Sequence, residues 1–183
     1  MEAIQSTILD AAERRIRTAG YHGFSFRELA ADVGIKSSSV HHHFPTKEAL
    51  GVAVARRYTD RFFAALPAGP PEPELVLRKA FLNAIESDGQ VCLCGALASG
   101  ASSLPPAVAE EAKRFFEQAL RYLSDRTAHS GTARRNWAAQ ILAQLEGAML
   151  VAVALEDRKA FTRATQKFPE APFRTKQPHP KTA

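Results

Sequence analysis

Apolar residues recur at intervals of three and four along most of the chain, which is the spacing of an amphipathic α-helix. Glycine and proline separate these runs and mark where one helix ends and the next begins. The first run predicts a helix that ends at Gly20, where a C-terminal cap belongs. Its apolar positions are Ile4, Ile8, Ala11, Ala12 and Ile16.

Two short helices are predicted next. Residues 25–28, Ser-Phe-Arg-Glu, have the form of a capping box, in which the serine caps a helix and the glutamate reaches back to the cap. That helix is short, because Gly34 follows it closely. A second short helix is expected over residues 39–44, and a longer one, capped by a threonine, over residues 46–66.

The sharpest predicted boundary lies at residues 67–73, where five of seven residues are proline or glycine. The apolar spacing beyond it predicts helices over residues 75–87, 91–101, 106–128 and 132–155, and a short one that ends near residue 168. The fold class is therefore expected to be all-α. We expect three segments: 1–66 with a linking helix, 74–168 as a helical bundle, and 169–183 as a disordered basic tail.

Composition narrows the class of protein. The chain has 183 residues, 45% of them hydrophobic and 23% charged, which is typical of a globular protein. The longest apolar run has nine residues, too few to cross a membrane, and the N-terminus lacks a secretory pattern. Two cysteines are too few for a disulfide framework, so a cytoplasmic location is expected. The net charge of +5 comes mostly from the tail, so any nucleic-acid binding by the N-terminal part must depend on particular groups.

The pair of short helices carries the most specific pattern. Counted from Phe26, a small residue falls at the fifth position (Ala30), glycine at the ninth (Gly34) and a branched apolar residue at the fifteenth (Val40). A helix-turn-helix needs these types for close packing, a left-handed turn and an anchor for its second helix. The alternative is an ordinary helical corner without a role in DNA binding. The capping box, turn and apolar frame together favour the DNA-binding interpretation.

From Phe24 to Leu50 the sequence resembles the TetR family of bacterial transcriptional repressors. Residues 40–44, Val-His-His-His-Phe, stand where that family has Leu-Tyr-x-Tyr-Phe, and Lys-Glu-Ala-Leu follows at residues 47–50. The resemblance covers about residues 3–60 in motifs and the remainder in architecture alone. It implies a repressor that binds palindromic operator DNA as a homodimer, is released by a small-molecule effector, and needs no cofactor.

The resemblance also assigns residues to DNA. It places Ser25 and Arg27 at the backbone-facing start of the first motif helix, and Lys47 on a phosphate. Residues at the start of the recognition helix and along it contact phosphates or bases; they are Lys36, Ser37, Ser38, Ser39, His41, His42 and His43. Two histidines replace the family's tyrosines, and Lys36 replaces the usual cap serine, so Ser37 is expected to cap the helix. Three adjacent histidines point about 100° apart on a helix, so a metal site there is not expected.

The helix over residues 141–155 is apolar on nearly every side, and only Gln144 and Glu146 in it are polar. One face can cover its own subunit, and the other is expected to meet a second copy of the chain. The predicted interface residues are Ile141, Ala148, Ala152 and Leu155. The alternative is a central helix enclosed within one subunit.

An effector pocket is expected among the bulky residues of the same region. The candidates are Phe81, Phe115, Phe116, Trp137 and Met149, although most such residues in any protein are core. The stretch 92–95, Cys-Leu-Cys-Gly, resembles one in a subset of these regulators, so a thiol sensor at Cys92 and Cys94 is a variant of the hypothesis. Buried, inert cysteines are the alternative.

No set of residues with catalytic spacing is present, so an enzyme is not expected. A ligand-responsive repressor accounts for the motif, the boundary and the apolar helix. A constitutive architectural DNA-binding protein accounts for the motif alone, and a small redox enzyme would depend on the cysteines.

Overall fold

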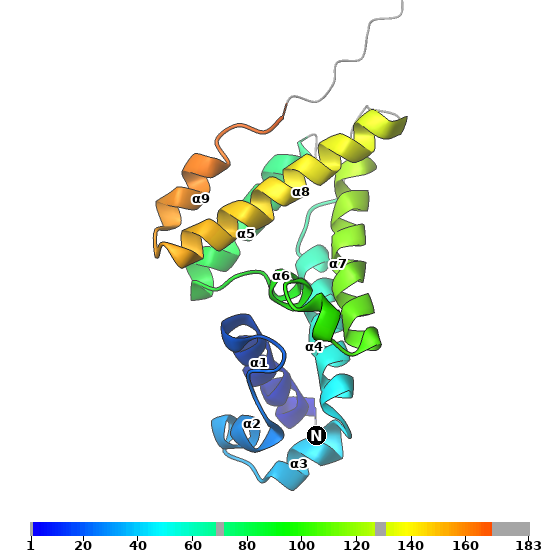
Figure 1. Cartoon of the computed structure of the whole chain (residues 1–183), viewed down its shortest axis with the longest axis vertical. Coiled ribbons are helices and arrows are strands. Elements are labelled where there is room, and N and C mark those ends of the chain that lie inside the picture. Colours follow the sequence, from blue (N-terminus) through cyan, green and yellow to red (C-terminus); the bar gives the residue numbers. More distant parts are fainter. Residues whose placement is uncertain (1, 69–71, 127–130, 170–183) are drawn as a thin grey trace, which may run out of the picture.

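The protein is described here by a computed structural model, in which residues 2–68, 72–126 and 131–169 are placed (Figure 1). Within these residues the chain forms nine α-helices and one 3-10 helix and has no strand, so the predicted all-α class is confirmed. The expected tail at residues 169–183 lies outside the described residues except for its first one.

Four helices form the N-terminal half: α1 (Glu2–Ala19), α2 (Phe26–Val33), α3 (Ser37–His43) and α4 (Lys47–Ala64). Helix α1 packs against both α2 and α4, and α2 packs against α3. Ile8, Ile16, Leu29 and Val40 are fully buried between these helices. Apolar residues at helical spacing therefore hold the two short helices in a fixed relation.

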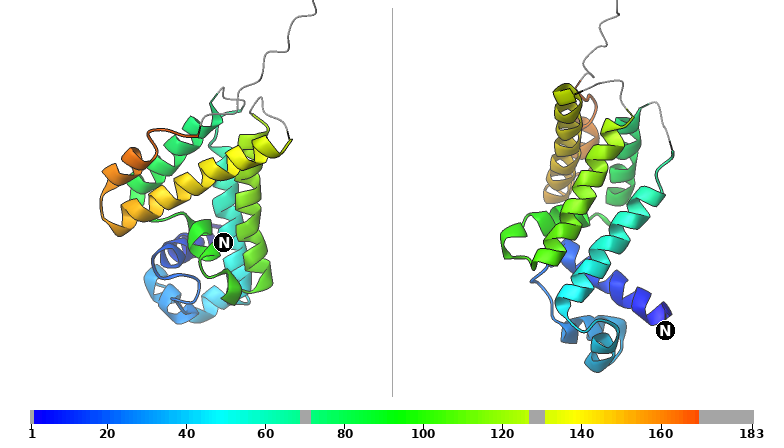
Figure 2. Two further views of the ribbon diagram at one scale, coloured as in Figure 1. Left: turned by 45° about the horizontal axis from the view of Figure 1, so that its top comes forward. Right: turned by 90° about the vertical axis from the view of Figure 1, so that its right-hand side faces the viewer.

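The C-terminal half contains α5 (Pro73–Asp88), α6 (Leu93–Ala98), η1 (Ala101–Ser103), α7 (Pro106–Ser124), α8 (Gly131–Ala154) and α9 (Arg158–Ala164). Helix α8 packs on α5, α7 and α9, and α4 runs alongside α7 into this half (Figure 1). Two further views show the α2–α3 pair at the end of the molecule opposite α8 and α9 (Figure 2).

Three predicted helices differ from the structure by more than two residues at a boundary. The helix expected over 91–101 is divided into α6 and η1, and α7 ends at Ser124 and α9 at Ala164, earlier than expected.

Helix α8 is long and apolar enough, by length and hydropathy alone, to cross a membrane, although its longest uninterrupted apolar run has only nine residues. One face of α8 is buried against its own subunit, as in the core helix of a folded domain.

Candidate DNA-binding surface and ligand cavity

Local hydrogen bonds build the start of α2 and the turn that follows it. The Ser25 hydroxyl accepts from the Glu28 N–H at 3.3 Å, and the Glu28 carboxylate accepts from the Ser25 N–H at 2.7 Å. These two bonds complete the predicted capping box. Gly34 has a φ of +73°, a left-handed conformation that side chains disfavour, so the predicted glycine turn is also present.

Helix α3 buries one branched residue and leaves its polar residues accessible. Val40 is fully buried, as the motif requires. The residues expected at DNA occupy exposed positions (Ser25, Arg27, Lys36, Ser38, His41 and His42) or half-buried ones (Ser37, Ser39, His43 and Lys47). Their accessibility agrees with a recognition surface, and their individual roles toward DNA stay predictions.

The expectation that Ser37 caps α3 was wrong. Lys36 occupies the N-cap position with an extended backbone, and its side chain makes no capping hydrogen bond. The Lys36 carbonyl accepts from the Ser39 N–H at 2.9 Å, so Ser37 is already the first helical residue. No side chain therefore fixes the start of α3, in contrast to α2.

The three histidines of α3 do not converge. The His41 ring packs edge-on against Phe26 with 4.7 Å between ring centroids, and the His42 and His43 rings are 5.5 Å apart. No group of three histidine, cysteine or acidic side chains that could hold a metal ion occurs in the part of the chain that the structure describes. The histidines are thus available for contacts outside the protein or, for His41, for packing on α2.

Lys47 is held closer to the protein than its predicted role requires. Its ammonium donates to the Phe24 carbonyl oxygen and lies 4.3 Å from the centroid of the Phe24 ring and 5.2 Å from that of Tyr21. Partial burial lowers the pKa of Lys47. A phosphate contact requires this ammonium to share or leave the carbonyl, so the predicted contact stays a prediction.

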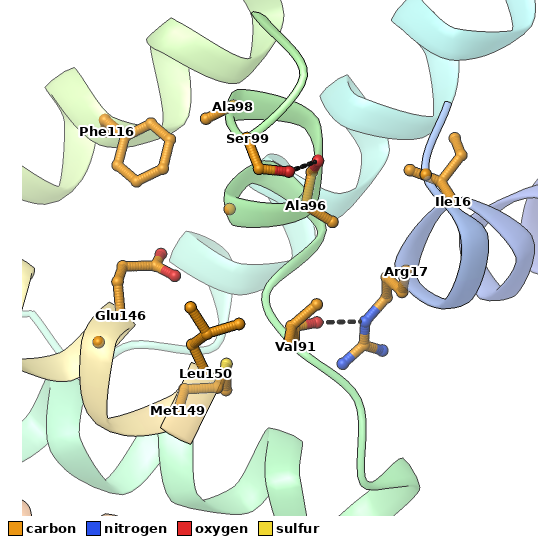
Figure 3. Close-up of a pocket in the computed structure, with 13 residues that line it drawn as sticks. Ile16, Arg17, Val91, Ala96, Ala98, Ser99, Phe116, Glu146, Met149 and Leu150 are labelled. Carbon is orange, nitrogen blue, oxygen red and sulfur yellow. Dashed lines mark hydrogen bonds between the residues drawn. The ribbon is translucent and has the colours of Figure 1, made fainter. Parts of the chain in front are cut away.

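A cavity of about 500 Å³ lies between α1, the segment before α6, α6, α7 and α8 (Figure 3). Of the five aromatic and Met candidates, Phe116 and Met149 line it. Phe81, Phe115 and Trp137 do not line this cavity; they are buried core side chains, and Phe81 and Phe115 both pack against Phe62 of α4. This cavity therefore gives no support to the prediction that those three residues line an effector pocket.

One carboxylate faces this largely apolar cavity. Glu146 extends from α8 toward α6, between Phe116 and Leu150 (Figure 3). The Cys92 thiol makes a hydrogen bond to the Glu146 carboxylate, yet burial dominates and raises the pKa of Glu146 to about 7. A Cβ on Gly95 would lie 2.8 Å from Glu146 Oε2, so the glycine makes room for the carboxylate. In the sequence, Glu146 stands out only as a polar exception in an apolar helix, and it was not predicted as a site residue.

Comparison with known proteins decides the family. The pattern of "Bacterial regulatory proteins, tetR family" matches residues 8–54. A TetR transcriptional regulator from Legionella pneumophila has the same fold, with a TM-score of 0.76 and 30% identity over 89% of this chain and 96% of that one. The chain belongs to the TetR family. The predicted family and the predicted class, a transcriptional regulator and not an enzyme, are therefore confirmed.

Two curated relatives match at the sequence level. The transcriptional regulator RutR of Escherichia coli K12 is 34% identical over 68 residues, 37% of this chain and 32% of that protein. The chain thus spans about a third of the length of RutR. The transcriptional repressor DhaR of Mycobacterium sp. strain GP1 is 29% identical over 132 residues, 68% of this chain and 67% of that protein.

In this TetR-family chain, α1 joins the motif half to the cavity. Ile16 and Arg17 of α1, and Gly20 directly after its end, line the cavity. The Arg17 guanidinium donates to the carbonyl oxygens of Val91 at 2.7 Å and Gln90 at 3.2 Å, in the segment that leads into α6. The helix that supports α2 and α3 is therefore also a wall of the cavity.

A second connection joins α4 to α7. Arg56 and Arg114 both bind the carboxylate of Glu111, which is largely buried; the Arg56 Nε and the Arg114 Nε each lie 3.0 Å from one of its oxygens. Arg114 also reaches Asp60 of α4 at 2.9 Å. The sequence predicts that this helix links the two halves, and these ion pairs attach α4 to α7.

The structure corrects most of the predicted dimer interface. Ile141, Ala148 and Ala152 are 0%, 5% and 2% exposed, because this face of α8 packs against its own subunit. Leu155 is 64% exposed and stays available to a partner. The accessible face of α8 is rotated away from the predicted one and carries Ala139, Ala143, Gly147, Leu150, Val151 and Ala154.

Both cysteines are buried. Cys92 lies between the Tyr58 hydroxyl and the Glu146 carboxylate, and burial raises its pKa well above the ordinary value. Burial likewise raises the pKa of Cys94 to about 12. A thiol sensor needs an exposed, low-pKa thiolate, so the geometry favours the alternative of inert, buried cysteines.

Proposed function

We propose that the protein is a homodimeric repressor that binds a palindromic operator and is released from it by a small molecule in the α1–α8 cavity. The observation that carries the proposal is that α1, which packs against α2 of the helix-turn-helix, contributes Ile16 and Arg17 to the cavity wall. A ligand there interacts with the DNA-binding half without any intermediate element. The match to the repressor DhaR supports repression, and a cytoplasmic location is part of the proposal because a bacterial operator would lie there.

The accessible face of α3 is the part of the proposed regulator that enters the major groove. Lys36 is exposed at the start of this helix and His42 is exposed along it, and Lys47 follows the helix. Positive side chains at such positions neutralise phosphate, and the histidine offers ring nitrogens to base edges. The two α3 helices of a dimer need to be about 34–36 Å apart to reach successive major grooves.

The dimer is proposed to form through the exposed face of α8. Gly147 and Ala143 let a second helix approach closely, and Leu150, Val151 and Leu155 supply apolar area that is 61%, 48% and 64% exposed in the protomer. Apolar patches of this kind on a soluble protein mark contacts with a partner. A two-fold axis beside α8 would place the same face of both copies against each other.

A binding selection tests the DNA part of this proposal. We expect duplexes selected from a random library by the full-length protein to share an inverted repeat. Replacing Lys47 with alanine should weaken binding to every duplex and flatten its salt dependence, because one phosphate contact is lost. Replacing His42 should change the preference among duplexes.

The matched control is Arg135→Ala, an exposed basic residue in α8 remote from α3, which should leave DNA binding unchanged. Unaltered DNA affinity in a variant with Lys36, His42 and Lys47 all replaced by alanine would show that the surface is wrongly assigned. If DNA binds but no small molecule affects its affinity, an architectural role replaces that of a regulated repressor.

A further inference from the structure

The cavity contains a buried acidic group whose hydrogen-bonding capacity is incompletely used. Glu146 Oε1 is shielded from solvent and has no hydrogen-bond partner among the described residues. The carboxylate points into the space between α6 and α8, and Figure 3 shows Phe116 and Leu150 on either side of it. A buried carboxylate oxygen without a donor is costly, so it marks a place where a ligand can supply one.

The positive side chain in the same cavity wall does not neutralise Glu146. Arg17 is held on the α1 side, where its guanidinium donates to the Val91 and Gln90 carbonyl oxygens and lies 3.9 Å from Glu13. Its charge is thus shared among backbone oxygens and another carboxylate. The site accordingly favours a positive group over a negative one beside Glu146.

The rest of the lining is apolar or small. Phe116, Met149 and Leu150 present hydrocarbon or sulfur surface, and Ala96 and Ala98 leave room beside α6. A volume of about 500 Å³ falls within the range of small-molecule sites, about 300–1,000 Å³. An aromatic or aliphatic body of drug-like size would therefore occupy most of the cavity, with one polar end at Glu146.

We propose that the effector of this regulator is an apolar molecule with a single cationic nitrogen, whose N–H donates to the Glu146 carboxylate. This inference rests on the proposed function, since it names the ligand class for the same cavity. Burial raises the pKa of Glu146 to about 7, and an ammonium group supplies the counter-charge that stabilises its ionised form. Gly95 contributes by leaving space for the carboxylate at α6.

Three fluorescent probes of one shape test the charge preference: 1-pyrenylmethylamine, 1-pyrenemethanol and 1-pyrenecarboxylate. Each is titrated into the full-length protein near pH 8, where Glu146 is ionised and the amine is protonated. We expect the amine to bind at least tenfold more tightly than the alcohol, and the carboxylate to bind most weakly. The amine should also release DNA selected by the protein, at concentrations at which the carboxylate has no effect.

The variant Glu146→Gln should abolish the tenfold preference for the amine while leaving the affinity for the alcohol within about twofold. Retained binding of the alcohol shows that the variant is folded and the cavity intact. The matched control, Glu86→Gln, removes an exposed carboxylate of α5 and should keep the full preference.

The outcomes separate the two proposals. Equal affinity for amine and alcohol, or a preference that survives Glu146→Gln, overturns the cationic ligand class and leaves the cavity as the effector site. Binding of none of the three probes overturns both the ligand class and the assignment of the cavity. Loss of alcohol binding in Glu146→Gln alone would show that Glu146 shapes the cavity and does not select charge, which also overturns the inference.

Discussion

Replacing Glu146 with glutamine should stabilise the ligand-free protein at neutral and alkaline pH and have little effect in acid. Burial raises the pKa of Glu146 from 4.5 to about 7, so the folded protein holds this proton more tightly than the unfolded chain does. Below about pH 4.5 both states are protonated, and no free energy is lost. As the pH rises toward 7 and beyond, the folded state must keep an ionised carboxylate buried, and the free energy of unfolding falls.

The size of the effect follows from the same pKa values. A difference between 4.5 and about 7, at ~1.4 kcal/mol for each pKa unit, gives about 3 kcal/mol as the full cost of ionising Glu146. Glutamine has nearly the same shape but no charge, so it avoids this cost. Part of the gain is lost because the amide accepts a weaker hydrogen bond from Cys92 than the carboxylate does. We therefore expect Glu146→Gln to be more stable by roughly 1–3 kcal/mol near pH 8.

Urea denaturation followed by circular dichroism measures this difference in the free energy of unfolding at several pH values between about pH 5 and pH 8. The protein concentration is kept fixed, because the stability of a dimer depends on protein concentration. The gain of the variant over the natural protein should grow with pH across this interval. Glu86→Gln on the surface of α5 should show no such growth. A stability difference that stays constant with pH, or that favours the natural protein near pH 8, would refute the account of Glu146 as a buried, under-compensated acid.

Two further predictions concern the dimer and the thiols. Val151→Asp on the exposed face of α8 should convert the dimer to a monomer in sedimentation experiments and weaken DNA binding. Leu75→Asp places the same charge at an exposed position of α5 and should leave the dimer intact. A dimeric Val151→Asp protein would contradict the proposed interface. Cys92 and Cys94 should react with a thiol reagent such as Ellman's only after unfolding, since both are buried with raised pKa values. Rapid reaction of the folded protein with the reagent would instead favour the hypothesis that Cys92 and Cys94 form a thiol sensor.

Local patterns predicted the N-terminal half well because its structure depends on short-range chemistry. The capping box at Ser25 and Glu28 and the left-handed turn at Gly34 involve residues only a few positions apart, so the sequence contains the whole interaction. The start of α3 is the exception. There the backbone at Lys36 takes the N-cap conformation without a capping hydrogen bond from any side chain, so a search for a capping residue could not locate the start of the helix.

The C-terminal half was predicted less well because its site depends on which face of each helix meets which neighbour. The sequence shows that α8 is apolar all round, and this pattern cannot distinguish a face buried in the subunit from one left for a partner. Ala148 and Leu150 illustrate the problem, since they are two residues apart and similarly apolar, yet one is buried and the other is exposed. Glu146 could not be identified as a site residue because its importance comes from Gly95, Cys92 and Phe116, which lie far from it in sequence.

The position of the cavity bears on how ligand and DNA could oppose each other. A ligand shifts a conformational equilibrium only by the difference between its affinities for the two conformers. Because Ile16 and Arg17 of α1 form part of the wall, any rotation of the motif half changes the cavity itself. A tenfold loss of DNA affinity corresponds to about 1.4 kcal/mol, so the ligand must favour the conformer that does not bind DNA by at least this difference in binding free energy. We infer that α1, and not α4 alone, carries the coupling, since α1 packs against α2 of the helix-turn-helix and also lines the cavity.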